Sequence, residues 1–223
     1  MSFAEILDVF LLLVTGIPAT VMLTLGALAI GIVGGVPVML ARRSHFKLLR
    51  FVAAGYVEIV RGIPPLVWIF IAFFGIPRLG LSAMSPAVAA TIALGIVSSA
   101  YLAEIYRAGV ESVPKGQWES SDSLALSGVD KFRRVIAPQA IPLILPPAGT
   151  FAVGMIKETA LASIIGVSEI TFLAYIQAQR TFEGLTIFAI AALVYLIICI
   201  PAAAATRRLD SSVNKQSRRL VLV

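Results

Sequence analysis

The chain has 223 residues, of which 59% are hydrophobic and 13% are charged, and its mean hydropathy is +0.95. Soluble domains average roughly 45–50% apolar and about 25% charged residues, so these few charges could not cover a water-facing surface. The composition therefore excludes soluble, disordered, collagen-like and disulfide-based proteins and predicts an integral membrane protein. We expect the net charge of +6 to orient the chain in the membrane, and we expect no nucleic-acid partner.

Five stretches of the chain are apolar enough to cross a bilayer, which takes about 20 residues of helix. The first lies in an uncharged run of 33 residues between Asp8 and Arg42, and it is no signal peptide because negative charges precede it. The predicted spans cover about 17–41, 54–76, 86–106, 143–165 and 184–206. We therefore predict an all-α polytopic membrane protein in which residues 1–223 form a single transmembrane domain.

Two spans carry features with a structural meaning. Gly31 and Gly35 in the first span have the small-residue spacing that permits close helix packing. Pro146 and Pro147 are expected to mark a broken start of the fourth span. Segment 165–182 is mildly apolar and predicts a short interfacial or partly buried helix.

The distribution of lysine and arginine predicts the orientation, because short cytoplasmic loops are enriched in both. The loop after the first span carries four such residues, the segment after the third carries five, and the C-terminal tail carries five (Arg207, Arg208, Lys215, Arg218 and Arg219). The opposite segments carry only Arg78 and Arg180. Five crossings with the N-terminus outside place every basic segment, and the C-terminus, in the cytoplasm.

The chain lacks residues that metal binding, triad catalysis and nucleotide binding require. His45 is the only histidine and Cys199 the only cysteine, so one chain cannot build a two-histidine metal site or a histidine-based triad. No Gly-Lys dipeptide occurs, which excludes a phosphate-binding GxxxxGK[ST] loop. We expect no catalytic residue, no metal and no cofactor in this chain, and any nucleotide-derived energy must come from another subunit.

The polar segment 107–140 predicts a short helix between two spans. Pro114 and Gly116 interrupt the preceding structure, and a helix of about eleven residues can start near Gln117 and end at Gly128, placed as a left-handed C-terminal residue. Glu119 and Asp122 would then lie near its N-terminal end, and Trp118, Asp122 and Ala125 would share one side. Such a helix fits the groove of a partner protein. The alternative is an interfacial helix lying on lipid headgroups.

The same segment resembles the cytoplasmic "EAA" loop of permease subunits in bacterial ABC importers. That pattern is E-A-A, then a glycine some seven residues on, then I-x-L-P. Here it is Glu119-Ser120-Ser121, Gly128 and Ile136-Ala137-Pro138, with both alanines replaced by serine and the leucine by alanine. Close helix approach is retained because the replacements are small.

The flanking sequence resembles the polar amino acid branch of these importers, which serves histidine, glutamine, glutamate, arginine and opines. Residues 58–77 resemble its E-x-x-R-G-T-P second span with Ile63 in place of threonine, and 104–119 and 156–171 also match. The resemblance covers roughly 16–210 and implies the type I ABC importer permease fold. It also implies a bacterial inner-membrane location and half of a translocation pathway.

The resemblance implies several partners. They are a dimer of ATPase subunits that bind ATP and Mg²⁺, a second permease subunit of the same or a homologous chain, an extracytoplasmic solute-binding protein, and membrane lipid. The residues expected to couple to the ATPase are Trp118, Glu119, Ser120, Ser121, Asp122, Leu124, Ala125, Gly128 and Pro138. Either Gly128→Pro or Glu119→Lys is expected to uncouple transport.

Charged residues at membrane depth are candidates for the substrate pathway, because an ionisable group in a span usually faces a bundle interior or cavity. The candidates are Glu58, Arg61, Thr150, Lys157 and Glu158. Glu158 could meet the cationic part of a zwitterion, or it could pack against the second permease. For the i,i+3 pairs Glu58–Arg61 and Glu104–Arg107 we favour structural ion pairs at the membrane interface, and a gate or substrate contact is the alternative.

The substrate predicted in this way is a polar amino acid or a related zwitterionic compatible solute. The main alternative is a self-contained secondary transporter or channel subunit. That class needs an internal inverted repeat or an ion site within the chain, and five spans provide neither.

Overall fold

The computed structural model describes residues 2–78 and 82–221, with side chains as far as Arg208, and every regular element in this part of the chain is helical. The helices are α1 (Phe3–Val14), α2 (Ile17–Arg42), α3 (Lys47–Gly62), α4 (Pro65–Phe70), α5 (Ile76–Arg78), α6 (Pro86–Glu111), α7 (Lys115–Ser123), α8 (Gly128–Asp130), α9 (Ala137–Glu158), α10 (Ile170–Thr181) and α11 (Gly184–Val221). Residues Ile71–Gly75 and Lys131–Ile136 form π-helical turns, and Thr159–Ile165 forms a 3₁₀ helix. The side chains of Lys215, Arg218 and Arg219 lie outside the described ones.

Four helical stretches are long and apolar enough to cross a membrane: 3–42, 86–111, 128–165 and 184–208. The helices of 47–62 and 65–78 qualify together as a fifth span, but they are bent by 101° at their junction. Ile63 is extended there (φ −99°, ψ 133°), because a residue before proline is disfavoured in the helical region and Pro64 and Pro65 follow it. The predicted span over 54–76 is therefore a bent pair. The all-α polytopic class is confirmed.

The prediction of a broken start to the fourth span is wrong. Helix α9 continues through Pro142, Pro146 and Pro147, and it joins the π-helical turn before it. Proline removes one donor but holds φ near the helical value, and spans tolerate the loss because neighbouring groups can satisfy the freed carbonyls. The expected helix in segment 165–182 is present as α10.

Helices α2 and α6 make the most extensive helix–helix contact among the described residues. A Cβ built on Gly31 would lie 2.4 Å from the Ser98 Cβ, and one on Gly35 would lie 3.1 Å from the Ala103 backbone nitrogen. The small-residue spacing thus serves close packing, as predicted. We call this contact the α2–α6 seam.

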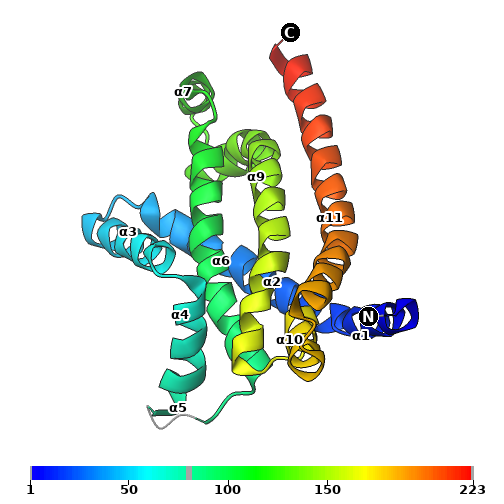
Figure 1. The fold of residues 1–223 in the computed structure, drawn as a ribbon. Coiled ribbons are helices and arrows are strands. Elements are labelled where there is room, and N and C mark those ends of the chain that lie inside the picture. Colours follow the sequence, from blue (N-terminus) through cyan, green and yellow to red (C-terminus); the bar gives the residue numbers. More distant parts are fainter. Residues whose placement is uncertain (1, 79–81, 222–223) are drawn as a thin grey trace.

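Two buried apolar clusters hold the spans together. One joins α2, α4, α6 and α9 around Leu23, Ile69, Leu94 and Met155, and the other joins α1, α10 and α11 around Leu13, Ile170 and Ile187. Helix α7 lies apart from both clusters, at the end of the molecule toward which the C-terminal part of α11 points (Figure 1).

Candidate functional site

Helix α7 is shorter than predicted and ends differently. It covers nine residues, Lys115–Ser123, and the left-handed residue after it is Ala125 (φ 51°). The amide nitrogens of Ala125 and Leu126 donate to the carbonyls of Asp122 (2.9 Å) and Ser121 (3.2 Å). This is the hydrogen-bond pattern of a Schellman motif, with alanine in the position that glycine usually occupies.

The prediction that Gly128 ends this helix is therefore wrong. Gly128 is the first residue of α8, and the Ser127 hydroxyl caps that turn by accepting from the Asp130 amide at 3.1 Å. Proline is tolerated at the first position of a helix, so Gly128→Pro no longer has a reason to uncouple anything. The signal that misled the interpretation was the glycine itself, since nothing local marks Ala125 as left-handed.

The dipole argument for Glu119 and Asp122 also fails, because α7 begins at Lys115, its first turn contains no acidic residue, and Asp122 lies in its last turn. Asp122 instead forms an ion pair with Lys131, in the π-helical turn before α9. A second polar contact joins α7 to the first turn of α9, since the Gln139 Nε2 donates to the Gln117 Oε1 at 3.1 Å. Helix α7 is therefore tied to the start of α9.

Trp118 is the main apolar anchor of α7. Its half-buried side chain packs against Val110 in the last turn of α6 and Val113 just after that helix, and against Ile136 just before α9 and Ala140 in its first turn. Ser121, one turn further on, is 2% exposed, and its hydroxyl donates to the Gln117 carbonyl at 2.6 Å. These two residues are the inner face of the helix.

The remaining predicted coupling residues are on the outside. Glu119, Ser120, Asp122, Leu124, Ala125, Gly128 and Pro138 are all exposed. Leu124, the residue directly after the helix, is an apolar side chain that is 73% exposed. Helix α7 therefore presents a polar surface with one apolar residue.

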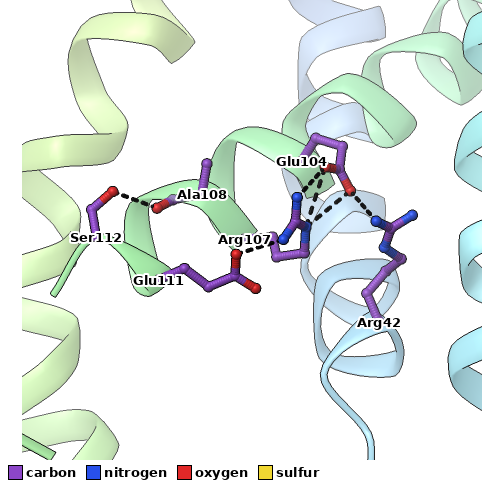
Figure 2. A network of polar contacts seen from close by, with 6 residues as sticks. All are labelled: Arg42, Glu104, Arg107, Ala108, Glu111 and Ser112. Atoms are coloured by element: carbon purple, nitrogen blue, oxygen red, sulfur yellow. Dashed lines mark hydrogen bonds and ion pairs between the residues drawn. The ribbon is translucent and has the colours of Figure 1, made fainter. Parts of the chain in front are cut away.

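A charge network lies directly before α7, at the end of α6 (Figure 2). The Glu104 carboxylate accepts from Arg107 at 2.8 Å and from Arg42 of α2 at 3.1 Å, and Arg107 also reaches Glu111 at 2.5 Å. The predicted pair Glu104–Arg107 is thus present. The contribution of Arg42 was missed, because a charge at the end of one span does not identify its partner on another.

The other predicted pair, Glu58–Arg61, does not form, and both residues are exposed. The Arg61 guanidinium carbon lies 4.9 Å from the centroid of the Tyr101 ring, within the range of a cation–π contact. Tyr101 in turn stacks on Phe151 of α9, with ring centroids 5.3 Å apart. Arg61 is therefore connected to α9 through two aromatic rings.

The predicted pathway residues of α9 fall on two faces. Phe151 and Glu158 are seven residues apart and share one side of the helix, as do Thr150 and Lys157 on the adjacent side. The Glu158 Oε2 is buried with no hydrogen-bond partner among the described residues. Thr150 is exposed, and its hydroxyl donates to the Pro146 carbonyl at 3.2 Å.

Lys157 is exposed and faces another element. It lines an apolar groove of about 480 Å³ between α9 and α11. The other lining residues are Ala160, Ala192, Tyr195, Leu196 and Cys199. The side chains of Lys157 and Glu158 therefore have different surroundings, although the two residues are adjacent in the chain.

Sequence reasoning missed one buried carboxylate, Glu169, which lies between two spans and is fully buried. It accepts from the Phe172 amide at 2.8 Å, capping α10, and from the Tyr195 hydroxyl of α11 at 2.8 Å. Burial raises the pKa of the Glu169 carboxyl above its ordinary value, and the hydrogen bonds oppose that rise. A lone acidic residue in a mildly apolar stretch was the available signal.

Comparison with known proteins identifies the family. Residues 27–215 match the model of the "binding-protein-dependent transport system inner membrane component". The probable amino-acid ABC transporter permease protein YckA of Bacillus subtilis is 39% identical over 88% of this chain and 87% of its own. The L-cystine transport system permease protein TcyB of the same organism is 37% identical over 90% of this chain and 87% of its own.

A solved structure of an amino acid ABC transporter with histidines has a TM-score of 0.88 and 32% identity, covering 95% of this chain and 99% of that one. The fold predicted from the resemblance is therefore confirmed. Because the family match covers most of the sequence, the chain belongs to the binding-protein-dependent transport system inner membrane components, as the permease subunit of an ABC importer.

Proposed function

We propose that this permease takes up a polar amino acid or a related zwitterion across the inner membrane of a bacterium. The names of its relatives support an amino-acid substrate, since one is a probable amino-acid permease and another an L-cystine permease. An extracytoplasmic binding protein delivers the solute, and the permease pairs with a second copy or homologue to complete the pathway. The C-terminal ends of α2 and α6 and the C-terminal part of α11 face the cytoplasm, because basic segments follow α2 and α6 and the basic tail lies in α11.

The energy for transport comes from a separate ATPase that binds ATP and Mg²⁺ and touches α7. The observation that carries this proposal is the construction of α7: an inner face of Trp118 and Ser121 fixed to two spans, and an outer face with Glu119, Ser120 and Leu124 exposed. A partner groove that receives Leu124 would bury an apolar side chain. The fixed inner face would then pass the partner's movement to α6 and α9.

The pathway itself is proposed to run beside the inner face of α9. Arg61, held over Tyr101, supplies a cation for a substrate carboxylate. Glu158, on the same side of α9 as Phe151 and with one buried oxygen lacking a partner, supplies an acceptor for a substrate ammonium group. Lys157 lies on another face of α9, and we assign it to contact with the second permease.

The test uses cells that express the permease with its ATPase and binding protein, and it measures uptake of radiolabelled histidine, glutamine and cystine. Glu119→Lys reverses an exposed charge on α7 and is expected to abolish uptake and co-purification of the ATPase while leaving membrane insertion unchanged. The same substitution at exposed Glu183, before α11, is the control and should retain both. Normal uptake in the Glu119→Lys variant would contradict the coupling role of α7.

The pathway residues are tested in the same assay. Glu158→Gln keeps the size of the side chain but removes its charge, and we expect it to change the ranking of the three solutes. An unchanged rate and ranking would exclude Glu158 from substrate contact.

A further inference from the structure

Two adjacent arginines at the end of α2 reach two different elements. Arg42 forms an ion pair with Glu104 of α6, and its neighbour Arg43 places its guanidinium carbon 5.2 Å from the centroid of the Trp118 ring of α7. Successive residues near the end of a helix point about 100° apart, so one turn of backbone can serve both contacts. The end of α2 therefore touches both the span before α7 and α7 itself.

The contact of Arg42 is well shielded from water. The side chains of Arg42 and Glu104 are 16% and 19% exposed, and the Glu104 carboxylate is shared with Arg107, whose Nε lies 3.2 Å from both of its oxygens (Figure 2). Charge-assisted hydrogen bonds of this kind are stronger than neutral ones and fix geometry. The last turns of α2 and α6 are thus held together by a network rather than by one exposed pair.

The α2–α6 seam brings the two helices into van der Waals contact up to that network. A Cβ on Gly34 would lie 3.2 Å from the Ser99 Cβ, and one on Gly35 would lie 3.2 Å from the Tyr106 ring. Packed interfaces of this density do not deform continuously. Helices α2 and α6 are therefore expected to move as one body.

Helix α7 meets this body at Trp118. The peptide chain joins α7 to α6 only through Ser112, Val113 and Pro114, while the Trp118 ring packs on the apolar cluster from α6 and α9 and lies against Arg43. The cation–π contact of Arg43 thus joins the C-terminal end of α2 to α7.

We propose that Arg42 and Arg43 are positioning residues that make the α2–α6 pair follow the movement of α7. The inference rests on the proposed coupling role of α7 and adds a second route for it. One route runs along the chain into α6, and the other runs from Trp118 through Arg43 into α2. Arg42 joins the two routes, because its ion pair with Glu104 prevents α2 and α6 from separating under load.

The experiment uses the complex of permease, ATPase and binding protein reconstituted in proteoliposomes, and it measures both ATP hydrolysed and radiolabelled histidine, glutamine or cystine imported. The variants are Arg43→Met, Trp118→Leu and the double variant, so that the coupling between the two residues is obtained from a double-mutant cycle. Leucine retains the apolar packing of Trp118 but has no ring face. Arg43→Lys is the rescue, because an ammonium group also binds a ring face.

The matched control is Arg50→Met. Arg50 is an exposed arginine in α3 that follows the same loop, and its side chain makes no hydrogen bond, ion pair or ring contact with the described residues. Arg50→Met therefore removes one positive charge from the same side of the membrane as Arg43→Met does. It should leave the ratio of ATP hydrolysed to solute imported unchanged.

We expect Arg43→Met and Trp118→Leu each to raise the ATP consumed per solute imported by about threefold to tenfold, with no further loss in the double variant. Co-purification of the ATPase should remain complete, and Arg43→Lys should restore most of the coupling. An Arg43→Met variant with wild-type coupling would overturn the inference. So would additive effects, or a loss of ATPase binding that parallels the loss of transport, because Arg43 would then only hold α7 in place.

Failure of the proposed function gives a different result. If the wild-type permease does not bind an ATPase through α7, then Glu119→Lys also leaves ATPase binding intact. In that case the role of α7 is wrong, whatever Arg43 does. If Glu119→Lys abolishes ATPase binding and Arg43→Met changes nothing, only the second route is wrong.

Discussion

The helices of the α2–α6 seam are held by tight packing along their length, whereas helix α7 is held by a few side-chain contacts. The seam has almost no free volume, since an added Cβ on Gly31 would lie 3.0 Å or less from the side chain and backbone of Ser98. Helix α7 is fixed by one tryptophan, one buried serine and a few polar contacts, and most of its residues are exposed.

The difference teaches how the two parts can divide the work. A densely packed pair transmits displacement without absorbing it, whereas an exposed helix can bind a partner without unpacking a core. Moving an inward/outward equilibrium from 1:99 to 99:1 requires about 5.5 kcal/mol of differential binding. That free energy reaches the spans only if the α2–α6 pair is rigid and α7 is firmly anchored to it.

The largest expected effect comes from filling the seam. Gly31→Leu forces a side chain into space already occupied by Ser98 and Leu102, and we expect it to destabilise the protein by about 3 kcal/mol or more. The measurement is the midpoint of thermal unfolding in detergent. Gly55→Leu is the control, because nothing lies within 4 Å of a Cβ at Gly55. Equal losses in both variants would mean that the seam is not especially tight.

The buried Glu169 carboxylate is a third case, because it joins α10 to α11 by hydrogen bonds rather than by apolar packing. Burial raises the pKa of Glu169, so the folded protein binds this proton more tightly than the unfolded chain does. The stabilisation that protonation provides is complete below the ordinary glutamate pKa of about 4.3. It is lost as the pH rises through the raised value.

Glu169→Gln cannot titrate and therefore isolates this effect. We expect the stability of the wild type relative to Glu169→Gln to fall with rising pH, by at most about 1.4 kcal/mol for each pH unit. Unfolding midpoints of both proteins between about pH 5 and pH 8 provide the measurement. A wild-type advantage that grows with pH would show that the hydrogen bonds from Tyr195 and Phe172 outweigh burial.

The smallest expected effect is on the end of α7. Ala125 is left-handed, which costs an alanine about 1–2 kcal/mol, so Ala125→Gly should slow hydrogen exchange of the Leu126 amide that is bonded to Ser121. Ala108→Gly in the exposed last turn of α6 has no strain to relieve and should instead destabilise the helix, by at most about 1 kcal/mol. Faster exchange at Leu126 in Ala125→Gly would contradict the observed cap.

The class of fold and the presence of a short helix between two spans could be predicted from the sequence, because both depend on local composition. Runs without charge identify spans, and the motif beginning at Glu119 identifies the segment around α7. The end of α7 could not be predicted, since Ala125 adopts a left-handed conformation only because the Schellman hydrogen bonds offset its strain. Glycine at 128 was a plausible alternative on sequence alone.

Contacts between distant parts of the chain were also beyond prediction. Nothing in the sequence pairs Arg42 with Glu104 or Glu169 with Tyr195, because each pair joins helices whose relative rotation is set by packing. The Glu58–Arg61 pair failed for a related reason. Its i,i+3 spacing permits contact, but the ring of Tyr101 on another helix competes for the guanidinium.

The most direct test of the central claim is a cross-link from α7 to the ATPase. In a Cys199→Ser background, Ser120→Cys places the only thiol on the exposed face of α7, and Leu185→Cys places it on a residue that is 90% exposed at the start of α11. We predict that a bifunctional maleimide joins the Ser120→Cys variant, and not the Leu185→Cys variant, to the ATPase in native membranes. Adducts from both positions, or from Leu185→Cys alone, would contradict the account.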